Sequence, residues 1–98
     1  MDDWMAIFSM AYNYEERKVA NTKEELFTLD TAAVTDRTWE YETAVKHQNF
    51  NNNQWITLEG CNTKEEAVAM HNRWLALLRM ELPVLVDYYD NSIYFKEV

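Results

Sequence analysis

Two histidines, His47 and His71, are the side chains of this sequence best suited to acid–base or ligand-binding chemistry. Histidine changes its charge near neutral pH, so small changes in its surroundings decide whether it holds a proton. His71 falls in the middle of the apolar face of a predicted helix, where it could act as a buried acid–base or orient a ligand. The alternative, which we favour, is a core histidine that bonds a strand carbonyl, a tyrosine hydroxyl or a carboxylate.

A metal site is a second use that the two histidines could have. His47 ends a predicted strand, and folding of that strand under the helix would bring it toward His71. Glu42 or Glu59 would then complete a set of metal ligands. However, the sequence has no local ligand spacing of the HExxH type, and Glu42 points to the opposite strand face from His47. We therefore predict no metal site and no cofactor.

Paired carboxylates and a thiol are the other groups with catalytic potential. Glu40 and Glu42 share a strand face about 7 Å apart, near the separation that paired-carboxylate hydrolases use. Alternation of apolar and charged residues along a half-solvated strand already explains both, and we keep them as candidate partner contacts. Cys61 precedes a helix start, but only Lys64 is a nearby cation in sequence, so we expect an inert thiol. A single glycine excludes a glycine-rich phosphate loop, and no catalytic residue or enzyme activity is predicted.

The loop QNFNNNQ, residues 48–54, is a candidate contact region. Phe50 stands there among amide side chains, and an exposed aromatic residue in such company is typical of a contact tip. In the alternative, the loop is only the end of a hairpin and Phe50 folds back on the core. The two interpretations stay open, with Phe50, Asn51 and Asn52 as possible partner contacts.

A set of strands must position these side chains. Residues 39–47 alternate with period two, and residues 55–59 return after a seven-residue loop, which predicts a hairpin. One face of the first strand carries Trp39, Tyr41, Thr43, Val45 and His47, and the other carries Glu40, Glu42, Ala44 and Lys46. Further strands are predicted at residues 4–12, 17–20 and 26–35, the last with Phe27, Leu29 and Thr31 on one face.

The pentapeptide NTKEE occurs at residues 21–25 and again at residues 62–66. After the second copy the apolar residues have a helical period, with Thr63 as the N-cap and Glu66 completing a capping box. This amphipathic helix is predicted over about residues 63–82 and ends at Pro83. Residues that prefer strands follow the first copy, so at most one helical turn is expected there. The two copies therefore do not mark a duplicated unit.

These elements predict an α+β fold in one domain, residues 1–98. We expect a mostly antiparallel sheet of about four to six strands, covered by the one long helix. VLVDYY and SIYFKE after Pro83 predict a C-terminal extended segment or hairpin. Glycine and proline each occur once, so asparagine is expected to occupy the left-handed turn positions.

The charge balance excludes several classes of partner. The net charge is −8, and the nine Lys and Arg residues are scattered, which argues against direct binding of nucleic acid or anionic lipid. The acidity suits solubility or a partner with a basic surface. A single cysteine rules out an intramolecular disulfide, and no apolar run is long enough to span a bilayer. The start, MDDWMAIFSMAY, lacks the basic residues of a signal peptide, so a cytoplasmic location is expected.

A series of short motifs runs from Tyr14 to Trp74. The motifs are YEERKV (14–19), LDTAAVTD (29–36), YETAVKH (41–47), Trp55, Glu59, TKEEA (63–67) and His71 with Trp74. The series resembles a group of small proteins encoded by tailed bacteriophages, which carry a similar YET-type strand, a tryptophan strand and an acid-started helix with a histidine. The resemblance implies a phage gene product. It assigns no site residue, because the group has no established biochemical activity.

Three functions follow as hypotheses, and we favour the first. It is a phage-encoded, non-enzymatic binding protein that acts on a host protein during infection, as an anti-defence or host-takeover inhibitor in the cytoplasm of the infected bacterium. The second is a small virion structural or decoration protein, which would form homo-oligomers. The third is an oligomeric binder that sequesters a signalling nucleotide, for which Arg17, Lys18, Arg37 and Arg73 would have to converge.

Overall fold

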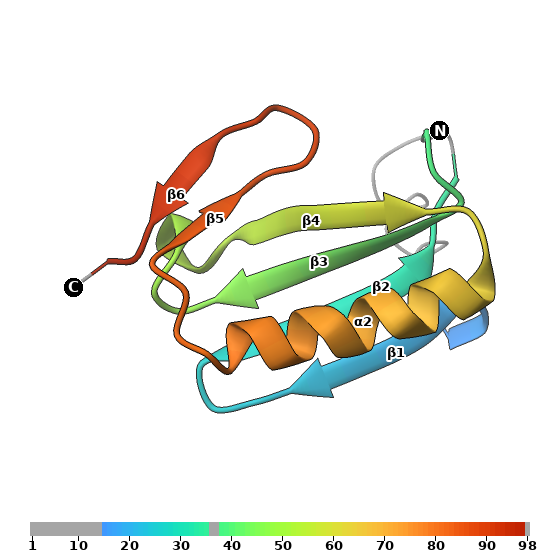
Figure 1. The fold of residues 1–98 in the computed structure, drawn as a ribbon, viewed down its shortest axis with the longest axis horizontal. Coiled ribbons are helices and arrows are strands. Elements are labelled where there is room, and N and C mark those ends of the chain that lie inside the picture. Colours follow the sequence, from blue (N-terminus) through green and yellow to red (C-terminus); the bar gives the residue numbers. More distant parts are fainter. Residues whose placement is uncertain (1–14, 36–37, 98) are drawn as a thin grey trace, which may run out of the picture.

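A four-stranded antiparallel sheet with the order β1-β2-β3-β4 carries one helix on one face, and a separate two-stranded antiparallel sheet follows (Figure 1). The computed structural model describes residues 15–35 and 38–97, and the strand predicted at residues 4–12 lies outside them. The elements are β1 (Lys18–Lys23), β2 (Phe27–Ala33), β3 (Tyr41–His47), the 3-10 turn η1 (Asn51–Asn53), β4 (Trp55–Cys61), α2 (Lys64–Leu78), β5 (Val84–Val86) and β6 (Ile93–Phe95). The predicted α+β class, with its C-terminal hairpin, is confirmed.

The buried face of the sheet follows the predicted alternation. Leu29 pairs with Val45, and Thr31 pairs with Thr43, and all four side chains are fully buried on the side that α2 covers. Because successive strand residues point to opposite faces, the residues between them lie on the other side of the sheet. The strand boundaries differ from the prediction by a few residues: β1 is Lys18–Lys23, β2 is shortened to Phe27–Ala33, β3 begins at Tyr41, and β4 extends to Cys61.

A β-bulge interrupts the pairing of β3 with β4. Thr43 pairs with Glu59 and Ala44 with Thr57, so Leu58 is an extra residue on β4. A bulge re-aims the side chains around it. As a result Leu58 is buried in the core, and Glu59 reaches two side chains of α2 instead of the opposite face.

The helix begins at the predicted cap but ends earlier than predicted. Glu66 donates its backbone N–H to Thr63 Oγ1 over 3.1 Å, and the Thr63 hydroxyl donates to the Glu66 carboxylate over 2.9 Å. The end predicted near residue 82 is wrong, because α2 stops at Leu78. Glu81 has a left-handed φ of 55°, and the residue before Pro83 is disfavoured in the helical region, so the chain leaves the helix there. This exit lets Leu82 pack against the core.

The first NTKEE copy does not begin a helix. Its first three residues belong to β1, and the remaining two lie in the turn before β2. The expectation of at most one helical turn before a strand is confirmed. The same five residues therefore adopt two structures, because the residues that follow them differ in period.

The core lies between the sheet, α2 and the C-terminal hairpin. Its main cluster consists of Phe27, Leu29, Val45, Phe50, Ile56, Leu58, Leu78 and Leu85, and a smaller one of Cys61, Ala67 and Met70 lies near the helix start. The Trp39 ring lies directly on Gly60, where any Cβ would overlap it. The only glycine of the chain is thus required by close packing rather than by a turn.

Candidate functional site

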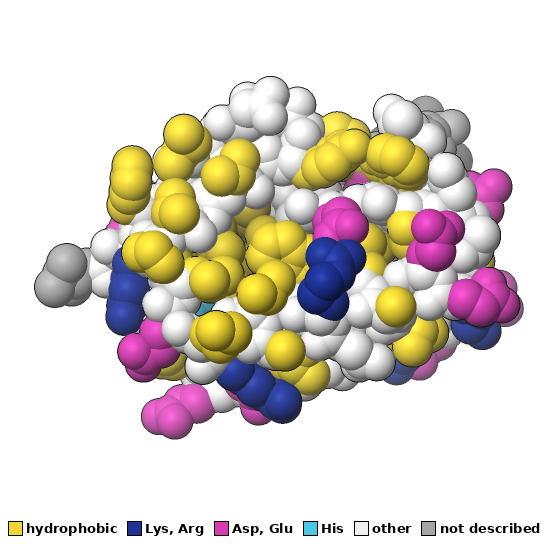
Figure 2. Space-filling model, viewed as in Figure 1, with side chains coloured by type: hydrophobic (Ala, Val, Ile, Leu, Met, Phe, Trp, Pro, Cys, Tyr) yellow, Lys and Arg dark blue, Asp and Glu magenta, His cyan; other side chains and the backbone are white. Residues whose placement is uncertain are grey.

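One face of the C-terminal hairpin carries exposed apolar side chains. In β5 and β6, Val84 pairs with Phe95 and Val86 pairs with Ile93, so these four side chains share a face. Val86, Ile93 and Phe95 are 44%, 58% and 72% exposed. The opposite face of the hairpin carries Leu85, which is buried in the core. Figure 2 shows the hydrophobic side chains that gather over this part of the molecule.

An apolar cleft lies beside this face, between α2 and the hairpin. Its volume is about 570 Å³, within the range of small ligand or peptide sites, and Trp74, Leu82 and Tyr88 are among the side chains that line it. Trp74 is held in place because its Nε1–H donates to Glu59 Oε1 over 2.8 Å. We call Val86, Ile93 and Phe95 together with Trp74, Leu82 and Tyr88 the hairpin surface.

The loop of the hairpin is fastened to the sheet. Asp87 accepts the Tyr89 N–H at Oδ1 over 2.9 Å and the Thr57 N–H at Oδ2 over 3.3 Å. Tyr88 donates its N–H to the Thr57 carbonyl over 2.8 Å. These bonds fix the loop before any partner arrives, which lowers the entropy cost of binding.

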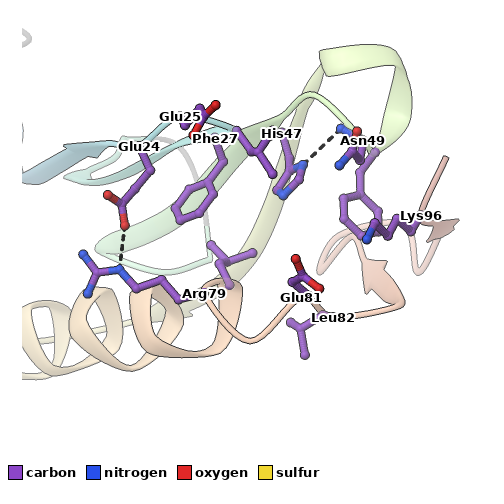
Figure 3. Close-up of a pocket in the computed structure, with 12 residues that line it drawn as sticks. Glu24, Glu25, Phe27, His47, Asn49, Arg79, Glu81, Leu82 and Lys96 are labelled. Carbon is purple, nitrogen blue, oxygen red and sulfur yellow. Dashed lines mark hydrogen bonds and ion pairs between the residues drawn. The ribbon is translucent and has the colours of Figure 1, made fainter. Parts of the chain in front are cut away.

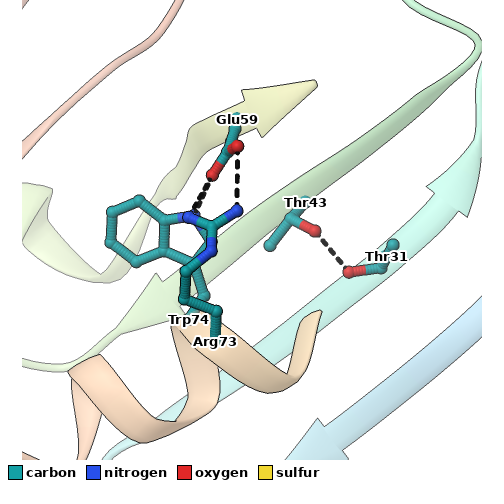
Figure 4. Close-up of polar contacts among 5 residues, drawn as sticks. All are labelled: Thr31, Thr43, Glu59, Arg73 and Trp74. Atoms are coloured by element: carbon teal, nitrogen blue, oxygen red, sulfur yellow. Dashed lines mark hydrogen bonds and ion pairs between the residues drawn. The ribbon is translucent and has the colours of Figure 1, made fainter. Parts of the chain in front are cut away.

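An ion pair between Arg73 and Glu59 lies next to Trp74, which lines the cleft (Figure 4). Arg73 donates two hydrogen bonds to the Glu59 carboxylate, over 2.8 Å and 2.9 Å. These bonds, helped by Trp74, lower the pKa of Glu59 against the opposing effect of burial, and they raise the pKa of Arg73. Both side chains are partly exposed, so water screens the pair, and its main effect is to orient Glu59 toward Trp74.

His71 is a buried core histidine, as favoured, but its partners are not those expected. Its Nδ1 lies 2.8 Å from Thr31 Oγ1 and its Nε2 lies 2.9 Å from Thr22 Oγ1. Thr31 bonds Thr43 in turn (Figure 4). Burial lowers the pKa of His71, although the charge of Asp30 acts in the opposite direction. Threonine hydroxyls therefore replace the carbonyl, tyrosine or carboxylate that the sequence led us to expect.

His47 lies elsewhere, at the far end of the same sheet face. It pairs with Phe27, four residues from Thr31 along β2, which places it about 13 Å from the His71 contact. Among residues 15–35 and 38–97, no three His, Cys, Asp or Glu side chains are grouped as a metal site would require. The hypothetical metal set of His47, His71 and a glutamate is thus not brought together.

A second cavity, of about 270 Å³, contains His47 (Figure 3). Its walls come from the β1–β2 turn, the end of β3, the exit of α2 and the C-terminal tail. His47 Nδ1 accepts the Asn49 N–H over 3.0 Å, and burial together with the charge of Lys96 lowers the pKa of the imidazole.

The predicted partner contacts do not form one surface. Phe50 is 2% exposed and belongs to the core, so its interpretation as a contact tip is wrong and the folded-back alternative holds. Asn51 and Asn52 have left-handed φ angles of 51° and 52°, as expected for asparagine in tight turns. Glu40 precedes β3, and Glu42 lies near its start, whereas the asparagines follow its end. The two groups of residues are therefore at opposite ends of β3.

Cys61 behaves as an inert thiol. It is buried, and burial raises its pKa, with Glu66 and Glu59 adding to the effect. The thiol donates a hydrogen bond to the Thr63 carbonyl over 3.5 Å. A nucleophilic thiolate is disfavoured by these surroundings.

The residues of the hairpin surface were missed in the sequence, although a signal was present. VLV and IYF are apolar at every position, and a two-stranded hairpin that packs on a core can bury only one of its faces. Lack of alternation in a terminal hairpin thus indicates an exposed apolar face. The His47 cavity has no such signal, because its walls are distant in sequence.

Comparison with known proteins gives no relative for this chain: no protein-family model, curated protein or solved structure matches it. In the described part of the chain, no helix has the length and apolar character needed to cross a membrane.

Proposed function

We propose that this protein is a non-enzymatic binding protein that docks on another protein through the hairpin surface. The observation that carries the proposal is the exposure of Ile93 and Phe95 on a hairpin whose other face is buried. Contiguous exposed apolar side chains of this kind mark interaction sites in proteins. Tyr88 and Trp74 belong to residue types that are enriched in interface cores.

The free energy gained by burying the exposed side chains indicates how much of the hairpin surface a partner must cover. Complete burial of one fully exposed large apolar side chain contributes about 2 kcal/mol, so the parts of Val86, Ile93 and Phe95 that are still exposed supply roughly 3.5 kcal/mol together. Association itself costs about 4 kcal/mol or more in lost freedom of motion. Contacts in the cleft beside Trp74 must therefore add to those of the hairpin for a stable complex.

The kind of partner rests on the sequence. The resemblance to phage-encoded proteins favours a host protein as the target, met in the cytoplasm of an infected bacterium, where binding would inhibit a defence or a host process. The net charge of −8 favours a target with a basic surface, because complementary charge speeds association. In the nucleotide hypothesis the cations must converge, but Arg73 pairs with Glu59 and Lys18 pairs with Glu15.

Site-specific photocrosslinking in lysate of the host bacterium tests the proposal. A crosslinkable residue at position 93 is expected to capture one host protein in stoichiometric amount. The same residue in place of Asn72, on the exposed side of α2, should capture none. Phe95→Ser should abolish the capture. Met80→Ser is the matched control, because Met80 is 71% exposed and lies outside the hairpin surface.

Three outcomes count against the proposal. Capture that is equal at both positions, or unchanged by Phe95→Ser, means that the hairpin surface is not the contact. Crosslinking of the chain to itself instead supports the homo-oligomer of the virion hypothesis. Mass spectrometry of purified particles then decides whether the protein is a virion component.

A further inference from the structure

The cavity around His47 has the size and lining of a small-molecule site, and it is separate from the hairpin surface. Four segments that are distant in sequence meet there, and its apolar walls include Phe27, Phe50, Leu78 and Leu82 (Figure 3). Its volume is about 270 Å³. A cavity of roughly 150 Å³ is already enough to bind benzene, so this one accepts a benzene-sized body with a polar group attached.

The polar group of such a ligand has a defined place. The His47 ring is held by stacking on Phe27, with centroids 5.6 Å apart, and by edge contact with Phe50 at 4.9 Å. Because Nδ1 accepts the Asn49 N–H, the neutral ring carries its proton on Nε2. Within the described residues, this Nε2–H has no hydrogen-bond partner, and it is not among the fully buried unsatisfied atoms, so it is reached from the cavity. The Nε2–H is therefore free to donate to water or to a ligand in the cavity.

The charges around His47 favour an anionic group at that end of the cavity. Lys96 lies close enough to lower the pKa of His47 by its positive charge. Arg79 is ion-paired with Glu24 across the wall of the cavity (Figure 3). Glu25 and Glu81 also line the cavity and are exposed, as Lys96 is, so water screens all three charges. Of these three charges, only that of Lys96 is among the causes of the lowered pKa of His47.

We propose that the cavity binds a small monocarboxylate with an apolar, benzene-sized body. The carboxylate accepts the His47 Nε2–H and pairs with Lys96, and the apolar body packs against Phe27 and Phe50. An ionised acceptor makes the stronger type of hydrogen bond. An apolar lining with a few convergent polar groups is the usual composition of a small-molecule site.

Three probes with the same ring and different heads test the proposal: benzoate, benzyl alcohol and benzylamine. NMR signals of the His47 ring are expected to shift saturably with benzoate, less with benzyl alcohol and least with benzylamine. The His71 ring, which is enclosed by threonines, serves as an internal control and should not move. Saturating benzoate should also raise the pKa of His47, because a nearby anion favours the charged imidazole.

Two lysine variants separate the site from general charge effects. Lys96→Met is expected to weaken benzoate binding about fivefold and to leave benzyl alcohol unaffected. Lys46→Met is the matched control, since Lys46 is exposed but does not line the cavity. The proposal is overturned if no probe gives a saturable shift at His47, if benzylamine binds as tightly as benzoate, or if both lysine variants weaken benzoate equally.

Discussion

The two histidines share almost the same degree of burial and differ in what their nitrogens contact. His47 and His71 are 6% and 2% exposed, and burial is the largest cause of the lowered pKa in both. Both nitrogens of His71 have hydroxyl partners, whereas His47 has one backbone donor and one nitrogen that lies at a cavity. A fully satisfied histidine stabilises the fold, and a half-satisfied one can still take a ligand. Burial and a shifted pKa do not by themselves distinguish the two roles.

Replacement of each histidine by leucine tests this difference most directly. His71→Leu is expected to lower the free energy of unfolding by about 2–3 kcal/mol, because two threonine hydroxyls lose their buried partner. His47→Leu should cost about 1 kcal/mol, since it removes one acceptor and leaves an apolar side chain among aromatic rings. Denaturant unfolding of both variants measures the difference. Equal costs would show that the two sites are structurally equivalent.

The pH dependence of stability is the second test. The unfolded histidines take up protons below about pH 6.5, while the folded ones, with lowered pKa values, do not. Stability is therefore present in full above that pH and is lost as the pH falls through and below it, by at most about 1.4 kcal/mol per pH unit for each histidine.

Denaturant unfolding at pH 7.5 and 5.5 measures this loss. Each leucine variant should lose less stability between the two values than the unaltered protein, and the double variant least of all. If the double variant loses as much free energy of unfolding between pH 7.5 and 5.5 as the unaltered protein, carboxylates rather than histidines control the pH dependence of stability.

The threonine partners of His71 provide a smaller and more local test. Thr22→Val removes the hydroxyl at Nε2 and is expected to cost about 1 kcal/mol. Thr28→Val is the matched control, because Thr28 is also half-buried but lies on the opposite sheet face. It should change the free energy of unfolding by less than about 0.5 kcal/mol. If Thr28→Val lowers the free energy of unfolding as much as Thr22→Val, the contact between Thr22 and His71 makes no special contribution to stability.

The smallest expected effect concerns the charge beside His47. Lys96→Met should raise the pKa of His47, since the positive charge that disfavours the imidazolium is lost. The pKa of His71 should stay the same, because Lys96 is not among the causes of its shift. NMR titration of the two ring signals measures both values in one sample. A parallel change in both would point to an altered fold instead of a local charge effect.

Features set by neighbouring residues could be predicted from the sequence, and features set by distant contacts could not. The Thr63 cap depends on residues three apart, and the alternation of β2 and β3 depends on period two, so both were recognised. The burial of Phe50 depends on packing against distant segments of the chain. Such contacts leave no pattern in the loop itself.

The helix end and the bulge illustrate the same limit. Pro83 marks where a helix must stop at the latest, but the left-handed Glu81 stops α2 earlier. The bulge inserts Leu58 as an extra residue in β4, and nothing in the local sequence WITLE predicts it. Without it, the orientation of Glu59 toward Trp74, and hence the wall of the cleft, could not be foreseen.

The way the hairpin is attached to β4 determines how easily it unfolds locally. Two-stranded hairpins are marginal by themselves, and this one is held by the burial of Leu85, by the Asp87 and Tyr88 bonds to Thr57, and by the Glu97 N–H bond to the Asn49 carbonyl. Loss of these few interactions costs much less than the loss of the sheet core, so the hairpin can open while β2 and β3 stay folded. Its amide protons are expected to exchange with solvent by this local opening, and those of the central strands only when the whole molecule unfolds.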